Sequence, residues 1–153
     1  MTIWLDGDAC PKPIKDILCK AATRTQINLI IVANHFFQTP PSKFIKKQLV
    51  RHGFDVADNY IVEHLTPGDL VITADIPLAD EAITKGGIVL NPRGVLYTTQ
   101  NIKQCLSNRN INESLRGSGH VSGGPSKLGA KEIQQFSKHL DKILMQQRKT
   151  LGQ

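Results

Sequence analysis

The chain has 153 residues, of which 40% are hydrophobic and 21% are charged, and its formal net charge is +6. These are ordinary values for a globular protein, so they argue against wholesale disorder and against a disulfide-stapled scaffold. No segment has the roughly 18 consecutive apolar residues that a membrane span needs, and Met1 leads into an apolar strand pattern without a charged leader. We therefore predict a single cytoplasmic domain over residues 1–153 that does not bind membranes.

The cysteines indicate which metal and redox chemistry is absent, and the charge distribution indicates a possible partner. Cys10, Cys19 and Cys105 lack CxxC spacing, which argues against a zinc site and favours reduced thiols. Residues 1–102 carry ten Lys or Arg and ten Asp or Glu, whereas residues 103–153 carry nine basic and three acidic residues. The excess positive charge could attract a polyanion such as nucleic acid, or it could form the solvated face of a helix.

The first third of the chain contains two predicted strands and one predicted helix. Residues 2–6 (TIWLD) form a short apolar run, and residues 12–22 have apolar side chains at helical spacing. Residues 27–33 (INLIIVA) have few polar interruptions, which predicts a strand covered on both faces. A loop is predicted over residues 34–42. The apolar spacing of residues 44–50 is compatible with either a helix or a strand, so this segment is left open.

The rest of the chain continues this alternation. We predict a helix over 55–65, a turn over 66–69, a strand over 70–74, a helix over 77–85, a strand over 88–91, a turn over 91–94 and a helix over 99–109. A glycine-rich loop over 116–129 and a basic amphipathic helix over 131–148 follow. Alternating strands and helices predict an α/β three-layer sandwich with a mostly parallel sheet.

Acidic residues follow two of the predicted strands. Asp6 ends the first strand, Asp8 lies two residues on, and Asp75 follows the strand at 70–74. Parallel strands end at one edge of a sheet, where the site of such folds usually lies, so we expect these carboxylates to meet there. Asp58 could join them from the first turn of its helix, or it could pair with Asp55 in a capping arrangement. Asp80, in the first turn after Pro77, could face the cluster or complement the helix dipole.

Clustered carboxylates repel one another and persist only if protons or cations share the site. Oxygen ligands without a matching set of His or Cys favour Mg²⁺ or Mn²⁺ over zinc. We therefore predict a divalent metal held by Asp6, Asp8 and Asp75, with Asp58 as a further catalytic candidate. One or two such ions could activate water and neutralise charge on a phosphodiester that is being cleaved.

Several other residues could contribute, and each also has a purely structural interpretation. Arg93 in NPRG could contact a phosphate or lie on the surface, and Arg116 and Lys127 of the glycine-rich loop could bind substrate or belong to a flexible linker. Cys10 at a helix start could be reactive, although burial is favoured. The aromatic segment 35–37 could stack a base or fill a loop.

Six short motifs together resemble one known family. They are DGDACP (6–11), FDVADNYI (54–61), GDLVITADIPLA (68–79), NPRG (91–94), LRGSG (115–119) and GGP (123–125). In this order they resemble the YaiI/YqxD family of small bacterial proteins, and the resemblance spans nearly the whole chain. That family is grouped with PIN-like domains, in which acidic residues at the sheet edge hold Mg²⁺ or Mn²⁺ and hydrolyse RNA or flap-like DNA. The resemblance implies a nuclease site at Asp6, Asp8, Asp58 and Asp75, with nucleic acid, in the first place RNA, as partner.

Many PIN-like enzymes place a further acid shortly after the third-motif aspartate, and here only Asp80 could serve. Two other classes therefore compete with the nuclease. A catalytically inactive module would bind nucleic acid or a nucleotide without cleaving it. A haloacid-dehalogenase-like phosphatase would use Asp6 as nucleophile, but that motif normally has a hydroxyl residue where Cys10 stands.

Overall fold

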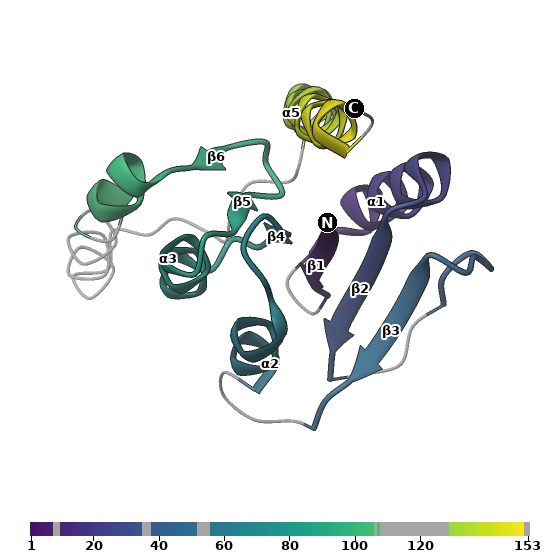
Figure 1. Cartoon of the computed structure of the whole chain (residues 1–153), viewed down its shortest axis with the longest axis horizontal. Helices are drawn as coiled ribbons and strands as arrows, with labels where there is room; N and C mark the ends of the chain where they lie inside the picture. The colour runs from purple at the N-terminus through teal and green to yellow at the C-terminus, as the bar shows by residue number, and fades with distance from the viewer. Residues whose placement is uncertain (8–9, 35–37, 52–55, 106, 108–128, 152–153) are drawn as a thin grey trace.

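The structure is a computed structural model of the chain, and it describes residues 1–7, 10–34, 38–51, 56–105, 107 and 129–151. Within these residues, the centre is a six-stranded sheet with the strand order β3-β2-β1-β4-β5-β6 (Figure 1). The strands are β1 (Thr2–Asp6), β2 (Asn28–Ala33), β3 (Ile45–Leu49), β4 (Leu70–Ile72), β5 (Ile88–Leu90) and β6 (Leu96–Tyr97). Strands β1 to β5 are parallel and β6 is antiparallel to β5. The predicted mostly parallel sheet is confirmed, whereas the two-residue strand β6 was not predicted.

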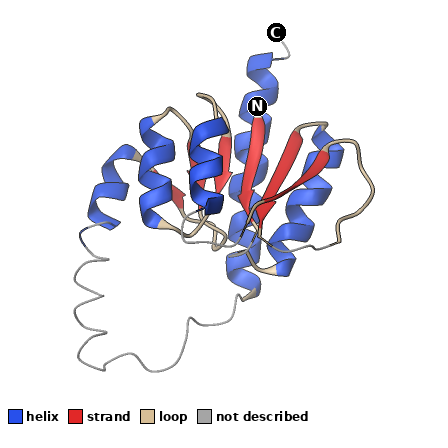
Figure 2. Cartoon of the chain, turned by 90° about the horizontal axis from the view of Figure 1, so that it is seen from below, coloured by secondary structure: helices blue, strands red, loops and turns tan. Residues whose placement is uncertain are grey.

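Helices cover both faces of this sheet. The labelled helices are α1 (Lys12–Thr25), α2 (Val56–His64), α3 (Ile76–Thr84) and α5 (Ala130–Leu151), and residues 99–105 are also helical. Figure 1 shows α1 and α5 on one face, and α2 and α3 on the other. The predicted α/β three-layer sandwich is therefore confirmed. Figure 2 shows that the C-terminal end of α5 extends past the N-terminal end of β1.

The two faces of the sheet carry separate hydrophobic cores, because successive side chains of a strand point to opposite faces. In β1, Ile3 and Leu5 pack in the core under α1 and α5, and Trp4 packs in the core under α2 and α3. In β4, Leu70 and Ile72 belong to the first core, and Val71 belongs to the second. Both central strands are thus buried on both faces, as their apolar sequences predict.

The ambiguous segment 44–50 is a strand. Its residues Ile45–Leu49 form β3, which pairs with β2 at the edge of the sheet. Lys46 and Lys47 are exposed there, and lysines on an edge strand disfavour pairing with other chains. The connection that leads from β2 to β3 runs beside α1, where the hydroxyl of Thr23 donates a hydrogen bond to Ser42 Oγ at 3.1 Å.

Some element boundaries differ from the prediction by a few residues. Helix α1 continues three residues past the predicted end, to Thr25, and is closed by Gln26 in the left-handed conformation with φ +60°. Strand β4 ends at Ile72, two residues early, because the next residues already form the cap of α3. Helix α3 begins at Ile76, so Pro77 is not its first residue.

The C-terminal helix α5 packs across the sheet and against α1. The predicted helix 131–148 lies within α5, whose buried side chains are Phe136, Leu140, Ile143 and Leu144. The predicted helix 99–109 is helical over residues 99–105, and Ile102 is buried as expected. The predicted loop 116–129 lies, apart from Gly129, outside the described residues. No helix in the described ranges is both long enough and apolar enough to cross a lipid bilayer.

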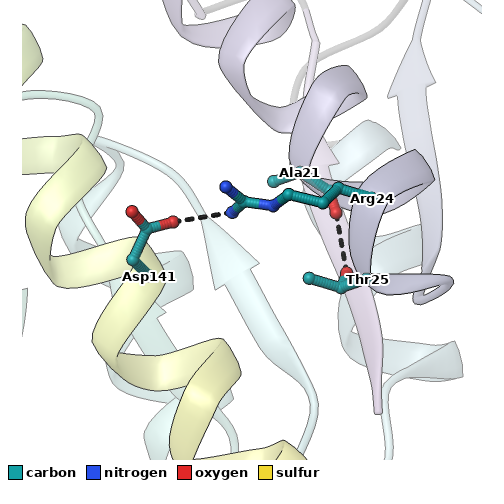
Figure 3. Close-up of polar contacts among 4 residues, drawn as sticks. All are labelled: Ala21, Arg24, Thr25 and Asp141. Atoms are coloured by element: carbon teal, nitrogen blue, oxygen red, sulfur yellow. Dashed lines mark hydrogen bonds and ion pairs between the residues drawn. The ribbon is translucent and has the colours of Figure 1, made fainter.

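An ion pair on the surface joins α1 to α5. The Nη2 atom of Arg24 lies 2.8 Å from Oδ1 of Asp141, and the hydroxyl of Thr25 donates to the carbonyl of Ala21 at 2.7 Å (Figure 3). The two charged side chains are 64% and 52% exposed. Solvent screens such pairs, so the contact between these helices depends mainly on the apolar side chains beneath the ion pair.

We expect Asp141→Asn to lower the free energy of unfolding by less than about 1 kcal/mol, because exposed ion pairs contribute little. Urea unfolding of Asp141→Asn, Arg24→Gln and the double variant gives the coupling energy of the pair. A coupling energy well above about 1 kcal/mol at physiological salt would contradict this expectation.

Candidate functional site

The sheet topology selects one position on the edge where the parallel strands end, which we call the carboxyl edge. From β1 the chain moves outward to β2 and β3 and then returns to β4, on the other side of β1. The direction of winding therefore reverses between β1 and β4. In open parallel sheets, ligands bind outside the carboxyl ends of the strands at such a switch point.

Asp6 lies at the carboxyl end of β1 and is 9% exposed. Strand alternation places it on the same face as Trp4, the face that α2 and α3 cover. Gly7 follows and extends the ladder, because its N–H donates to the carbonyl of Val32 at 2.8 Å. A Cβ atom at Gly7 would lie 2.7 Å from Cγ2 of Ile31, so close packing against β2 requires the glycine between Asp6 and Asp8.

Asp75 lies three residues beyond the end of β4, the neighbour of β1. Its Oδ1 atom accepts a hydrogen bond from the N–H of Leu78 at 2.9 Å, which makes it the N-cap of α3. Its own N–H donates to Oγ1 of Thr73 at 3.0 Å. One hydrogen bond to the carboxylate and one from the backbone N–H thus position this half-buried residue at the switch point, as a cap and as a candidate ligand.

Thr73 is a site residue that the sequence analysis missed. Leu5 pairs with Ile72, so the next residues along the two strands, Asp6 and Thr73, lie at the same level. The Thr73 side chain is buried, with 1% exposure, and it orients the turn that carries Asp75. A threonine two residues before an aspartate at a strand end was the available signal, because hydroxyls in this position often accept from the backbone.

Asp58 and Asp80 lie on helices rather than at strand ends. Asp58 is in the first turn of α2, which contacts β1 and β2, and its side chain is half-buried. A helix that leads back to the next parallel strand begins at the carboxyl edge, so α2 brings Asp58 to the same edge as Asp6. Asp80 is the fifth residue of α3 and lies beyond its first turn, which contains no acidic residue. The dipole interpretation of Asp80 is therefore wrong.

The structure brings Asp6 and Asp75 to neighbouring strand ends, and Asp58 to that edge. Across the described ranges, no group of three or more His, Cys, Asp or Glu side chains could hold a metal ion. Asp8 lies outside the described residues, so the predicted set of Asp6, Asp8 and Asp75 stays a prediction.

The structure describes Arg93 but not the other two predicted substrate-binding residues. Arg93 lies in the turn after β5, at the carboxyl edge, where its Nη1 atom is 3.9 Å from Oε1 of Glu132 on α5. Its backbone N–H donates to Oδ1 of Asn91 at 2.7 Å, so NPRG also has a structural role. Arg116 and Lys127 lie outside the described residues, as does the aromatic segment 35–37.

The thiol of Cys10 is unsuited to nucleophilic chemistry. Burial raises its pKa to about 12, with a smaller raising effect from Asp6 and a lowering effect from Lys15. The side chain is 9% exposed, and its sulfur contacts the carbonyl of Pro11 at 3.6 Å. The favoured interpretation of Cys10 as a buried residue is confirmed, and at neutral pH it remains the protonated thiol.

The fold and the residues at the carboxyl edge of the sheet together define the structural class of this protein. It is a three-layer α/β protein in which carboxylates lie at the switch point of a mostly parallel sheet. A family model described as "Uncharacterized BCR, YaiI/YqxD family" matches residues 4–146. The chain belongs to this family.

Close relatives cover almost the whole chain. A UPF0178 protein of Legionella pneumophila (strain Corby) is 57% identical over 145 residues, which are 95% of this chain and 98% of the relative. A UPF0178 protein of Shewanella sediminis (strain HAW-EB3) is 55% identical over 144 residues, which are 94% of this chain and 96% of the relative. No solved structure matches the chain.

Proposed function

We propose that this protein is a metal-dependent nuclease of the PIN-like type, which hydrolyses phosphodiester bonds of RNA or of single-stranded or structured DNA. The observation that carries the proposal is the position of Asp6 and Asp75 at the carboxyl ends of β1 and β4. These neighbouring strands flank the switch point of the sheet, where open parallel sheets bind their ligands.

The donor atoms at this edge fit a hard divalent cation. Asp6 and Asp75 offer carboxylate oxygens, and Asp8 follows Asp6 by two residues. Mg²⁺ is commonly held by one or two carboxylates together with substrate phosphate and water, so the proposal requires no protein ligands beyond carboxylates such as Asp6 and Asp75. This donor set therefore favours Mg²⁺ or Mn²⁺ over zinc.

Each residue of the edge has a definable task in this proposal. The bound cation supplies Lewis-acid stabilisation of negative charge at the phosphodiester. Asp6, with its side chain withdrawn from solvent, and Asp75, fixed by Thr73 and Leu78, hold their oxygens in set positions. Such preorganisation lowers the reorganisation needed during the reaction. The basic last third of the chain, with nine Lys or Arg against three Asp or Glu, attracts the polyanionic substrate.

Asp75→Asn tests this proposal without removing the cap of α3. Asparagine caps helices as well as aspartate does, so the variant should fold, whereas its neutral amide no longer compensates a cation. We expect cleavage of a labelled RNA or single-stranded DNA with Mn²⁺ to fall by about a hundredfold or more. Asp141→Asn, which removes one exposed carboxylate on α5, is the matched control and should cleave normally.

Three outcomes of the same assay would contradict the nuclease. Equal cleavage by Asp75→Asn and the native chain would place the activity elsewhere. Release of phosphate from small phosphate esters without nucleic-acid cleavage would indicate a phosphatase. Nucleic-acid binding with no cleavage in either metal would indicate an inactive binding module.

A further inference from the structure

A pocket of about 420 Å³ lies on the α1 side of the carboxyl edge. One wall is the N-terminal half of α1, and the opposite wall is residues 38–40 of the connection from β2 to β3. Pro40 of this connection provides exposed apolar lining, whereas Ile31 of β2 and Cys19 of α1 lie buried at the base of the pocket. Its volume falls within the range of small-molecule sites, which begins at about 300 Å³.

The polar lining of this pocket is mainly cationic. Lys12 and Lys15, from the first turns of α1, line it together with a single acid, Asp16. Gln38 and Thr39 add an amide and a hydroxyl from the opposite wall. Basic side chains near a helix start are unfavourable for the helix itself, so helix stability does not explain the two lysines. An apolar contact surface at Pro40 together with two ammonium groups matches the two halves of a nucleotide, its base and its phosphate.

The pocket adjoins the proposed catalytic edge. Ile31, which lines it, is the residue that closely approaches Gly7, the neighbour of Asp6. Strand alternation places Asp6 on the face that α2 and α3 cover, and Lys15 lies on α1 at the other face, so the end of β1 separates the two groups. A nucleic-acid strand that crosses the edge at Asp6 can therefore place a neighbouring unit in the pocket.

We propose that this pocket binds one nucleotide, with its phosphate at Lys12 and Lys15 and its base against Pro40. This proposal rests on the proposed function in one respect, because it makes the pocket the position of the nucleotide beside the scissile phosphodiester. A nucleotide can come from two sources, a free mononucleotide or a unit of a strand, and both present the same chemistry to the pocket.

The direct test is a metal-free titration of the full chain with AMP, adenosine and inorganic phosphate, followed by ¹⁵N NMR. We expect AMP to bind more tightly than adenosine or phosphate, because only AMP fills both halves of the pocket. The double variant Lys12→Gln/Lys15→Gln should weaken AMP binding by about tenfold or more, and Asp16→Asn should strengthen it by about threefold. Lys20→Gln removes an exposed charge on the same helix outside the pocket and should leave the affinity unchanged.

Comparison of AMP with a 5′-phosphorylated hexanucleotide distinguishes the two sources. A hexanucleotide that binds more tightly than AMP, and loses affinity in the lysine double variant, indicates a unit of a strand; tighter binding of AMP indicates a free mononucleotide. Either order of the two affinities supports the proposed nucleotide pocket if the lysine double variant weakens the binding of the tighter ligand. Equal AMP affinity of the double variant and Lys20→Gln, with native thermal unfolding of both, would overturn it.

The cleavage assay separates failure of this proposal from failure of the proposed function. The native chain could show no cleavage while AMP binding is weakened by Lys12→Gln/Lys15→Gln and strengthened by Asp16→Asn. In that case the pocket is supported and the nuclease is not. If Asp75→Asn abolishes cleavage while the lysine double variant keeps the native KM and the native AMP affinity, the nuclease is supported and the pocket is overturned. A raised KM with unchanged kcat in the double variant supports both.

Discussion

Gly94→Ala is expected to lower the free energy of unfolding by about 2–5 kcal/mol, because two penalties coincide at this position. Gly94 has φ +90°, which side chains other than that of glycine rarely adopt. An added Cβ would also lie 2.7 Å from the backbone nitrogen of Phe136 and 2.9 Å from Cγ of Gln135 on α5. The backbone of α5 cannot move without disturbing Phe136, whose side chain is fully buried. Urea unfolding measured by far-ultraviolet circular dichroism gives the loss.

Gly68→Ala is the matched control for this prediction. Gly68 has nearly the same φ, +92°, but an added Cβ would lie within 4 Å of no atom of the described residues other than its chain neighbours. It should therefore show the backbone penalty alone, about 1–2 kcal/mol. The difference between the two variants measures the contact of the NPRG turn with α5. Equal losses would show that α5 does not pack against Gly94 as described.

The motif NPRG shows which features of a turn can be predicted from local sequence and which cannot. Its Pro and Gly predict a turn, and a turn is present, with the N–H of Gly94 donating to the carbonyl of Asn91 at 2.8 Å. What makes Gly94 necessary is the approach of Phe136, which lies 42 positions later in the chain. No local pattern encodes that contact. The same limit applies to the segment 44–50, which became a strand because β2 offered a free edge.

The candidate site, too, could be predicted only where it depends on local sequence patterns. The rule that parallel strands end at one edge sufficed to place Asp6 and Asp75 together, because both follow strands with strong apolar patterns. Thr73 was missed because it lies within that apolar pattern, although its position two residues before Asp75 was a signal for the hydrogen bond between them. The pocket between α1 and residues 38–40 was missed because these segments lie side by side only in the folded chain.

Asp69 is a second residue whose role local sequence concealed, because TPGD predicts only a turn. It lies at the start of β4, on the opposite edge from Asp75, and is 5% exposed. Its Oδ2 atom accepts from Nε1 of Trp4 at 3.0 Å and from the N–H and hydroxyl of Thr66 at 2.9 and 3.1 Å. Its Oδ1 atom accepts from the N–H of Thr2 at 3.0 Å. One carboxylate therefore ties the start of β1 to the start of β4 and holds the two central strands in register.

We expect Asp69→Asn to lower the free energy of unfolding at pH 7 by about 3–4 kcal/mol. Both carboxylate oxygens accept hydrogen bonds, so an amide must turn its NH₂ group toward the N–H of Thr2 or toward the donors of Trp4 and Thr66. One side of the network then has donors facing donors, and buried polar groups lose their partners. Trp4 is the only tryptophan of the chain, so its fluorescence reports unfolding in urea. Asp141→Asn, at an exposed carboxylate, is the control.

The effect of Asp69→Asn should shrink in acid. Burial raises the pKa of Asp69, but hydrogen bonds from Thr66, Trp4 and Thr2 outweigh that effect, so the pKa lies below its ordinary value. Because the folded-state pKa is lower than the unfolded one, this carboxylate stabilises the fold fully above the unfolded pKa, near 3.9. That stabilisation is lost as the pH falls through the folded pKa. The difference in unfolding free energy between native chain and variant should therefore be constant from pH 7 to about 5 and narrow below pH 4. A difference that stays constant down to pH 2 would show that folding does not lower the pKa of Asp69.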